Sequence, residues 1–158
     1  NATSVVCFAE TGLSLSTTGT YRTFDQQLQL FLQRYTSTFD PAVNSDPPIT
    51  RTYKDHAFYL RKWAAPAAPP GSSNHGWGLA VDAGWAVGSP GSLVQSITLN
   101  QKGWEWCVNE LTSFGWSWEG AKPDQRGWEP WHWKYVAGDA VPQRVLDVEK
   151  FLTAAAKP

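Results

Sequence analysis

The clearest periodic pattern of apolar and polar residues lies between residues 23 and 35. Apolar side chains recur there at intervals of three and four residues, at Phe24, Leu28, Phe31, Leu32 and Tyr35. This spacing predicts an amphipathic helix. Thr23 and Gln26 form a capping-box pattern directly before the run, which marks the first turn of that helix.

Three further helices are predicted, with weaker patterns. One covers about Asn100 to Phe114, with apolar residues on one face and Gly115 as its stop. A terminal helix begins at about Pro142, because proline suits the first turn of a helix. Residues 49–62 have no clean period, and a short helix around Lys54 to Trp63 is the expectation there.

The strand signals surround two short motifs. A Leu-Ala-Val run ending at Asp82 predicts a short buried strand with Asp82 at its end. In the segment 131–135 the residues alternate, so Trp131, Trp133 and Tyr135 are expected on one face and His132 on the other. A third strand is expected at 116–118, and a strand or loop at 13–20, leading to Tyr21 and Arg22; residues 1–12 are weakly patterned.

The loops are marked by prolines, glycines and aspartates. They are expected at 40–48, at 124–127 and at 64–71, the last being an ordered loop that leads to the first motif. Because strands and helices do not alternate as βαβ units, the pattern favours an α+β fold, a small antiparallel sheet flanked by helices. At 158 residues the whole chain, 1–158, is expected to be a single domain.

The charge and hydropathy of the chain give no support to a nucleic acid or a membrane as its partner. The net charge is −1, which gives no reason to expect nucleic acid or an anionic membrane surface. No apolar run approaches the roughly 20 residues of a membrane span. No signal peptide opens the sequence, which excludes neither export nor a cytoplasmic origin.

Tryptophan is unusually abundant, with ten residues in a chain that has no methionine. Four of them lie around the second motif: Trp118, Trp128, Trp131 and Trp133. They fill the core, or some of them line a groove for an extended ligand, since aromatic walls offer a large contact area. The two cysteines, Cys7 and Cys107, have no CxxC partner. The sequence leaves two buried thiols and one disulfide equally open.

The candidate chemistry lies in two stretches. The first runs from Ser73 to Asp82 and places His75 seven residues before Asp82; the second places Glu129 three residues before His132. Two histidines and one aspartate are a sufficient ligand set for a catalytic zinc that keeps its fourth position for water. Glu129 could then take a proton from that water. His56 has no comparable context and is expected to be a surface or core residue.

These stretches carry a resemblance to a known family. Residues 73–82 resemble the S-x-H-x-x-G-x-A-x-D signature of the VanY-type zinc D-alanyl-D-alanine carboxypeptidases, and residues 129–135 resemble its E-x-W-H motif. Residues 20–23, Thr-Tyr-Arg-Thr, followed by two glutamines, resemble the S-G-Y-R-S segment, with Gly19-Thr20 where Ser-Gly is usual. The three motifs occur in the expected order between about residues 13 and 136.

The resemblance implies a role for each matching residue. His75, Asp82 and His132 would be the ligands of one zinc ion per chain, and Glu129 the general base and acid. Arg22 would steady the oxygen of the substrate carbonyl. Two further residues would help to hold the substrate, Ser73 and Gln27.

The family also implies the substrate class, peptidoglycan stem peptides, and therefore a secreted or cell-wall-associated bacterial protein or a phage lytic protein. A monomer is expected. Three functions stay open: a carboxypeptidase that removes terminal D-alanine, an endopeptidase that cuts within the stem peptide or a crossbridge, and a non-catalytic zinc-containing domain that binds the wall. The match of residues 129–133 favours the carboxypeptidase.

Overall fold

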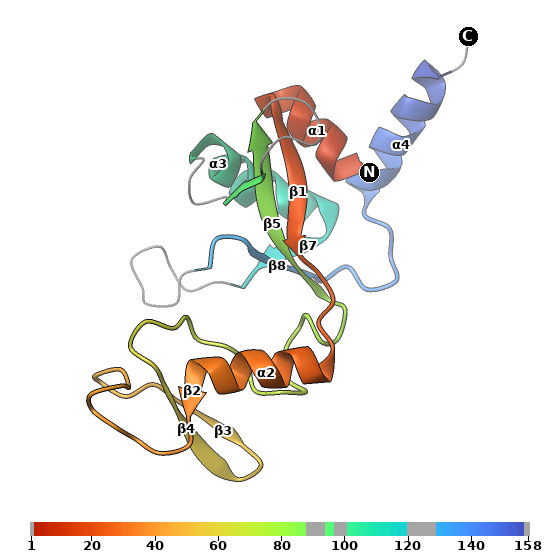
Figure 1. The fold of residues 1–158 in the computed structure, drawn as a ribbon. Coiled ribbons are helices and arrows are strands. Elements are labelled where there is room, and N and C mark those ends of the chain that lie inside the picture. The colour runs from red at the N-terminus through yellow and green to blue at the C-terminus, as the bar shows by residue number, and fades with distance from the viewer. Residues whose placement is uncertain (1, 88–93, 97–100, 120–128, 157–158) are drawn as a thin grey trace. The chain divides into compact units, whose positions relative to one another are not determined.

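The computed structural model describes residues 2–87, 94–96, 101–119 and 129–156. The chain forms two compact units, labelled by element in Figure 1. Unit 1 comprises residues 1–20 and 79–158, and unit 2 comprises residues 21–78. The expectation of one domain over 1–158 stays a prediction.

Unit 1 is built on an antiparallel sheet. Its strands are β1 (Leu13–Gly19), β5 (Ala80–Val87), β8 (His132–Tyr135) and β7 (Trp116–Trp118), in that order, with β6 (Val94–Ser96) paired to β5. The helices are α1 (Ala2–Thr11), α3 (Gln101–Glu110) and α4 (Gln143–Ala155), and the 3-10 turn η2 (Leu111–Phe114) follows α3. In Figure 1, α1 and α3 lie beside the sheet and α4 extends away from it.

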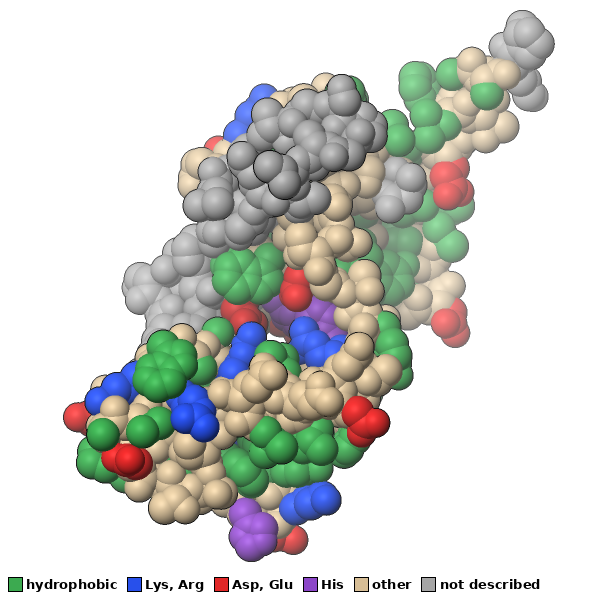
Figure 2. All heavy atoms as spheres, viewed as in Figure 1, with side chains coloured by type: hydrophobic (Ala, Val, Ile, Leu, Met, Phe, Trp, Pro, Cys, Tyr) green, Lys and Arg blue, Asp and Glu red, His purple; other side chains and the backbone are tan. Residues whose placement is uncertain are grey.

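The core of unit 1 is rich in tryptophan. Trp85, Trp106 and Trp133 are buried there, and Trp118 and Trp131 pack against it. The core-filler interpretation therefore holds for these five, and Trp128 lies outside the described residues. Figure 2 shows hydrophobic side chains on the surface of α4, in keeping with the finding that none of its residues is buried.

Unit 2 contains α2 (Phe24–Arg34) and a small antiparallel sheet in the order β2 (Tyr35–Thr36), β4 (His56–Leu60), β3 (Thr50–Tyr53). The predicted helix is confirmed as α2. Both hydrogen bonds of the capping box are present, Gln26 N to Thr23 Oγ1 at 3.2 Å and Thr23 N to Gln26 Oε1 at 2.9 Å. Phe31 of α2 stacks on Tyr35 with ring centroids 4.6 Å apart.

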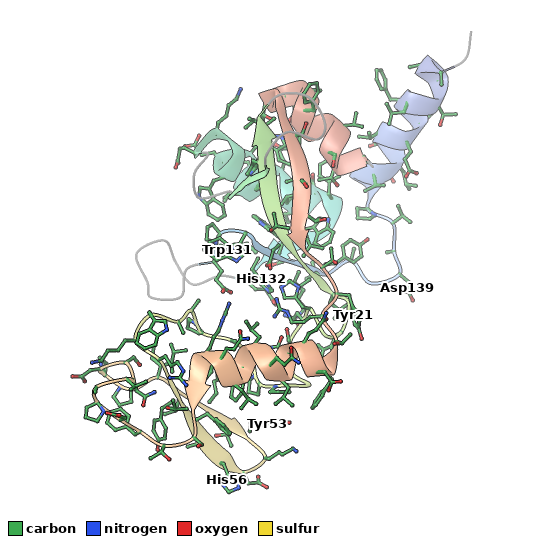
Figure 3. The ribbon with its side chains drawn as sticks, in the orientation of Figure 1. Tyr21, Tyr53, His56, Trp131, His132 and Asp139 are labelled. Carbon is green, nitrogen blue, oxygen red and sulfur yellow. The ribbon has the colours of Figure 1, made fainter. Side chains whose placement is uncertain are left out.

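The helix predicted around Lys54 to Trp63 is wrong. Strands β3 and β4 form a hairpin whose two-residue turn, Lys54 and Asp55, has positive φ at both positions, 48° and 61°. Paired positive φ angles suit the twist of a tight hairpin. His56 lies at this turn and is exposed (Figure 3), so it is a surface histidine, as one of the two expectations had it.

The loop that leads to the first motif is ordered, as predicted. Residues 64–69 adopt no helix or strand, but side chains of α2 and β2 bind their carbonyls. Gln27 Nε2 donates to Ala68 O at 2.6 Å, Arg34 Nη1 to Pro66 O at 3.2 Å, and the Tyr35 hydroxyl to Ala67 O at 3.2 Å.

Most of the other elements predicted for unit 1 are present. Strand β7 and the helix after Pro142 are confirmed, and the predicted helix 100–114 is α3 followed by η2, with Asn100 outside the described residues. Gly115 ends this segment with φ 87°. Residues 1–12, weakly patterned in sequence, form α1. Residues 124–127, predicted as a loop, lie outside the described residues.

The fold class is therefore α+β, as predicted: the described residues form four α-helices and two small antiparallel sheets. None of the described helices is long and apolar enough to cross a membrane. Cys7 and Cys107 are free, buried thiols, which decides between the two alternatives. Burial raises the pKa of the Cys7 thiol to about 11 and raises that of Cys107 as well.

Candidate metal centre

The pairing of β5 with β8 brings two of the predicted ligands together within unit 1. Asp82 lies directly opposite His132 in the register of these strands. Asp82 Oδ1 is 3.3 Å from His132 Nδ1, and the two side chains are 20% and 16% exposed. The prediction that the strand ends at Asp82 is wrong, because β5 continues to Val87 along β1.

The side chain of Asp82 has space because its neighbour on β1 is a glycine. A Cβ built on Gly19 would lie 2.6 Å from Asp82 Oδ2 and 3.2 Å from Asp82 Cγ. The register between β1 and β5 shifts between Thr17 and Gly19, which is a bulge beside Asp82. Gly19 therefore allows the carboxylate its position, although it departs from the usual serine in the sequence motif.

The turn before β8 fixes Glu129 next to His132 in the chain. The carbonyl oxygen of Glu129 accepts hydrogen bonds from His132 N and from Trp118 Nε1, both at 3.0 Å. Figure 3 shows Trp131 and His132 where β8 begins. Two turn residues, Pro130 and Trp131, thus separate Glu129 from His132, and the His132 N–H donates across them to the Glu129 carbonyl.

Glu119 is a residue of this region that the sequence analysis missed. Its carboxylate lies 4.0 Å from His132 Nε2 and 3.2 Å from Lys134 Nζ. Glu119 directly follows β7, and Trp118 at the end of β7 pairs with Trp133. The sequence places Glu119 directly after a predicted strand, but its closeness to His132 follows from the pairing of β7 with β8, which the sequence does not reveal.

The other predicted residues lie in unit 2. His75 is 4% exposed and Ser73 6% exposed, and both belong to a tight turn in which Gly76 N donates to Ser73 O at 2.9 Å. Arg22 N donates to the carbonyl of His75 at 3.1 Å, which ties the segment before α2 to this turn.

Gln27 is buried and bonded at both ends of its amide, which its sequence motif did not predict. It is 2% exposed, its Oε1 accepts a hydrogen bond from Arg22 Nη1 at 2.8 Å, and its Nε2 is bound to Ala68 O. Both ends of the amide are therefore engaged within unit 2, and one of them orients the guanidinium of Arg22.

His75 of unit 2, with Asp82 and His132 of unit 1, forms a group that could hold a metal ion. The donors of this group, two imidazoles and a carboxylate, suit a divalent metal such as zinc.

The sequence of the chain matches a known family. The sequence pattern of the VanY family, described as D-alanyl-D-alanine carboxypeptidase, matches residues 5–138. This chain belongs to the VanY family. Membership supports a peptidase, a hydrolase of peptide bonds, and the match includes every residue singled out above. No curated protein sequence matches the chain.

Several solved structures are similar to the chain, and three of them are described below. One is VanYB in complex with D-Alanine-D-Alanine, with 19% identity, a TM-score of 0.49, and coverage of 94% of this chain and 75% of VanYB. Another is a mutant of the vancomycin-resistance D,D-pentapeptidase VanY in complex with Zn(II), with 19% identity, a TM-score of 0.47, and coverage of 93% and 76%.

The third is the LdcB LD-carboxypeptidase, described in terms of peptidoglycan recognition. It has 20% identity and a TM-score of 0.53 over 95% of this chain, which spans 61% of LdcB. At this identity the similarity supports the α+β fold and nothing about the reaction.

Proposed function

We propose that the chain is a zinc-dependent peptidase that hydrolyses peptidoglycan stem peptides, most specifically as a D-alanyl-D-alanine carboxypeptidase. The observation that carries the proposal is the pairing of Asp82 with His132 across β5 and β8 in a chain of the VanY family, whose motif also includes His75. One zinc ion per chain would be held by these three residues, which leaves a fourth position for water or substrate.

The zinc ion, when bound, would lower the pKa of its water to about 7 and polarise the substrate carbonyl. Glu129 would accept the proton of the attacking water and deliver it to the leaving amine. Its place in the chain, one turn before His132, supports this role.

Arg22 would stabilise the negative charge that develops on the carbonyl oxygen. Gln27 supports this role because its hydrogen bond fixes the guanidinium, and a preorganised donor of this kind contributes about 3–4 kcal/mol to transition-state stabilisation. Ser73 is proposed to help hold the substrate, as the family motif implies. For Gln27 the buried contacts favour a role through Arg22.

The general base separates an enzyme from a binding domain of the same fold. Glu129→Gln keeps the size of the side chain but removes the base, so the variant should fold, retain zinc and lose nearly all turnover. Hydrolysis at the parental rate would refute the role of Glu129 and would leave the wall-binding function as the better proposal.

The alternative within the enzymes is a peptidoglycan endopeptidase. Incubation with a free pentapeptide and with intact sacculi, followed by mass spectrometry, distinguishes the two. Release of one terminal D-alanine supports the carboxypeptidase. Soluble wall fragments from sacculi, with the pentapeptide left intact, would establish the endopeptidase. Either activity implies a protein that is secreted or associated with the cell wall.

A further inference from the structure

Three aromatic side chains that lie within two residues of Arg22 or His75 in the chain are more than half exposed. Tyr21 is 63%, Phe24 52% and Trp77 58% exposed. Side chains of this kind cover about 200 Å² each, so roughly 350 Å² of aromatic surface faces solvent. We call these three residues the aromatic surface.

Phe24 and Trp77 come together at Gly71. The indole N–H of Trp77 donates to the Gly71 carbonyl at 3.1 Å, and a Cβ on Gly71 would lie 3.8 Å from Phe24 Cε2. Gly71 has φ +84°, a conformation that favours glycine. The same residue therefore anchors one ring and lies against the other.

Trp77 is held in place although its ring is exposed. Its backbone N–H lies 3.2 Å from Ser73 O and 3.3 Å from Asn74 O, and its indole is bound to Gly71. A ring fixed at both backbone and side chain loses little conformational entropy when it binds a ligand. This preorganisation is the expected property of a binding surface.

The aromatic surface is continuous with residues of the proposed active site. Tyr21 and Phe24 flank Arg22, and Trp77 is two residues after His75. Arg22 N and His75 O are joined by a 3.1 Å hydrogen bond. Figure 3 shows Tyr21 directly before the start of α2. A ligand on this surface would therefore be a part of the substrate, or lie next to it.

The size and chemistry of the surface indicate a ligand of a few rings. A stable protein partner buries about 800 Å² on each side, more than twice the area available here. The three side chains carry no charge, which disfavours the ionised groups of a stem peptide. A sugar ring presents a face of C–H groups with slight positive charge, which packs on the negative face of an aromatic ring.

We propose that Tyr21, Phe24 and Trp77 bind a sugar ring of the peptidoglycan glycan strand, with Trp77 as the stacking platform. This inference rests on the proposed function, because it assigns the part of the wall polymer that the enzyme contacts outside the peptide. The surface would favour peptides attached to glycan over free peptides.

Binding to glycan strands stripped of their stem peptides tests the proposal without any hydrolysis. The parental protein should bind these strands in a pelleting assay, and Trp77→Ala should weaken binding about three- to tenfold. Phe24→Ala should weaken it less. Trp63→Ala is the matched control: Trp63 is 74% exposed in the same unit, and its indole forms no hydrogen bond with any residue that the structure describes. This variant should bind as the parent does.

Two measurements separate glycan binding from a structural role. Trp77→Ala should retain zinc, and the fall in glycan binding should exceed any change in kcat/KM for a soluble pentapeptide. No binding of stripped strands by the parent, or an equal loss of pentapeptide hydrolysis and wall binding in Trp77→Ala, would overturn the proposal in favour of a peptide-binding role. Failure of the proposed function would appear separately, as a parental protein that leaves the pentapeptide uncut.

Discussion

Replacing Gly19 by alanine tests the position of Asp82 more directly than removing Asp82 itself. The new methyl group would lie 2.6 Å from Asp82 Oδ2 and 3.3 Å from Asp82 Cβ. A carbon atom approaches a non-bonded neighbour comfortably at about 3.5 Å, so the carboxylate must move by nearly 1 Å. A displacement of this size at a reacting group can cost a factor of about 100 in rate.

The expected consequence is a loss of metal affinity with little loss of stability. Residues that orient metal ligands typically change affinity or activity by about 10–100-fold when mutated, and we expect Gly19→Ala to fall in this range. The fold should survive, because the atom nearest the methyl group is the terminal oxygen of a side chain and not a backbone atom.

Competition with a chromophoric chelator measures zinc affinity, and urea denaturation measures stability. Gly138→Ala is the control. Gly138 has φ +61° and a Cβ there would meet no atom within 4 Å, so alanine should cost about 1–2 kcal/mol of stability and leave zinc affinity unchanged. Parental zinc affinity in Gly19→Ala would refute the placement of Asp82 as a ligand beside Gly19.

Three other substitutions, at Arg22, Gly103 and Cys7, test the site and the packing of the core. Arg22→Lys removes the planar fork, so kcat should fall with KM nearly unchanged; a change in KM alone, measured by steady-state kinetics, would make Arg22 a binding residue. Gly103→Ala places a methyl group against the buried ring of Trp85 and should cost about 1–3 kcal/mol in urea denaturation; an unchanged midpoint would show that α3 shifts freely. The pKa of Cys7 is raised to about 11 by burial, from an ordinary value near 9. The unfolded thiol therefore ionises first, and the free energy of unfolding should fall between about pH 9 and 11. Cys7→Ala should decline less steeply with pH, and an identical decline would contradict the assignment.

Local signals predicted those elements whose stabilising contacts lie close together in the chain. The capping box of Thr23 and Gln26 is such a signal, since both of its hydrogen bonds join residues three apart. Gly115 is another, because a left-handed residue at a helix end is a local requirement.

The wrong predictions lie where the local sequence lacks the usual signal for the structure that it forms. The β3–β4 turn has Lys54 and Asp55 at positions where glycine or asparagine is the usual signal for positive φ. The hairpin was therefore missed. The length of β5 was missed because its second half is fixed by pairing with β1, a contact between segments more than sixty residues apart.

The residues of the candidate site could be predicted from local motifs, but their geometry could not, because it depends on contacts between segments far apart in the chain. The family motifs identified Asp82 and His132, but their direct opposition depends on the register of β5 and β8. The burial of Gln27 and its hold on Arg22 depend on the approach loop at Ala68. Neither sequence spacing nor residue type carries that information.

The exposure of α4 determines which part of this helix unfolds most readily. The first half of this helix is held: Arg144 pairs with Glu10 at 3.6 Å, and Val145 and Val148 pack against the core. The second half ends in Phe151, 71% exposed, and Leu152, 39% exposed. A helix of this length gains little stability without packing. Its last turns can therefore unravel and reform many times during one lifetime of the folded sheet, as a local event that leaves the metal ligands undisturbed.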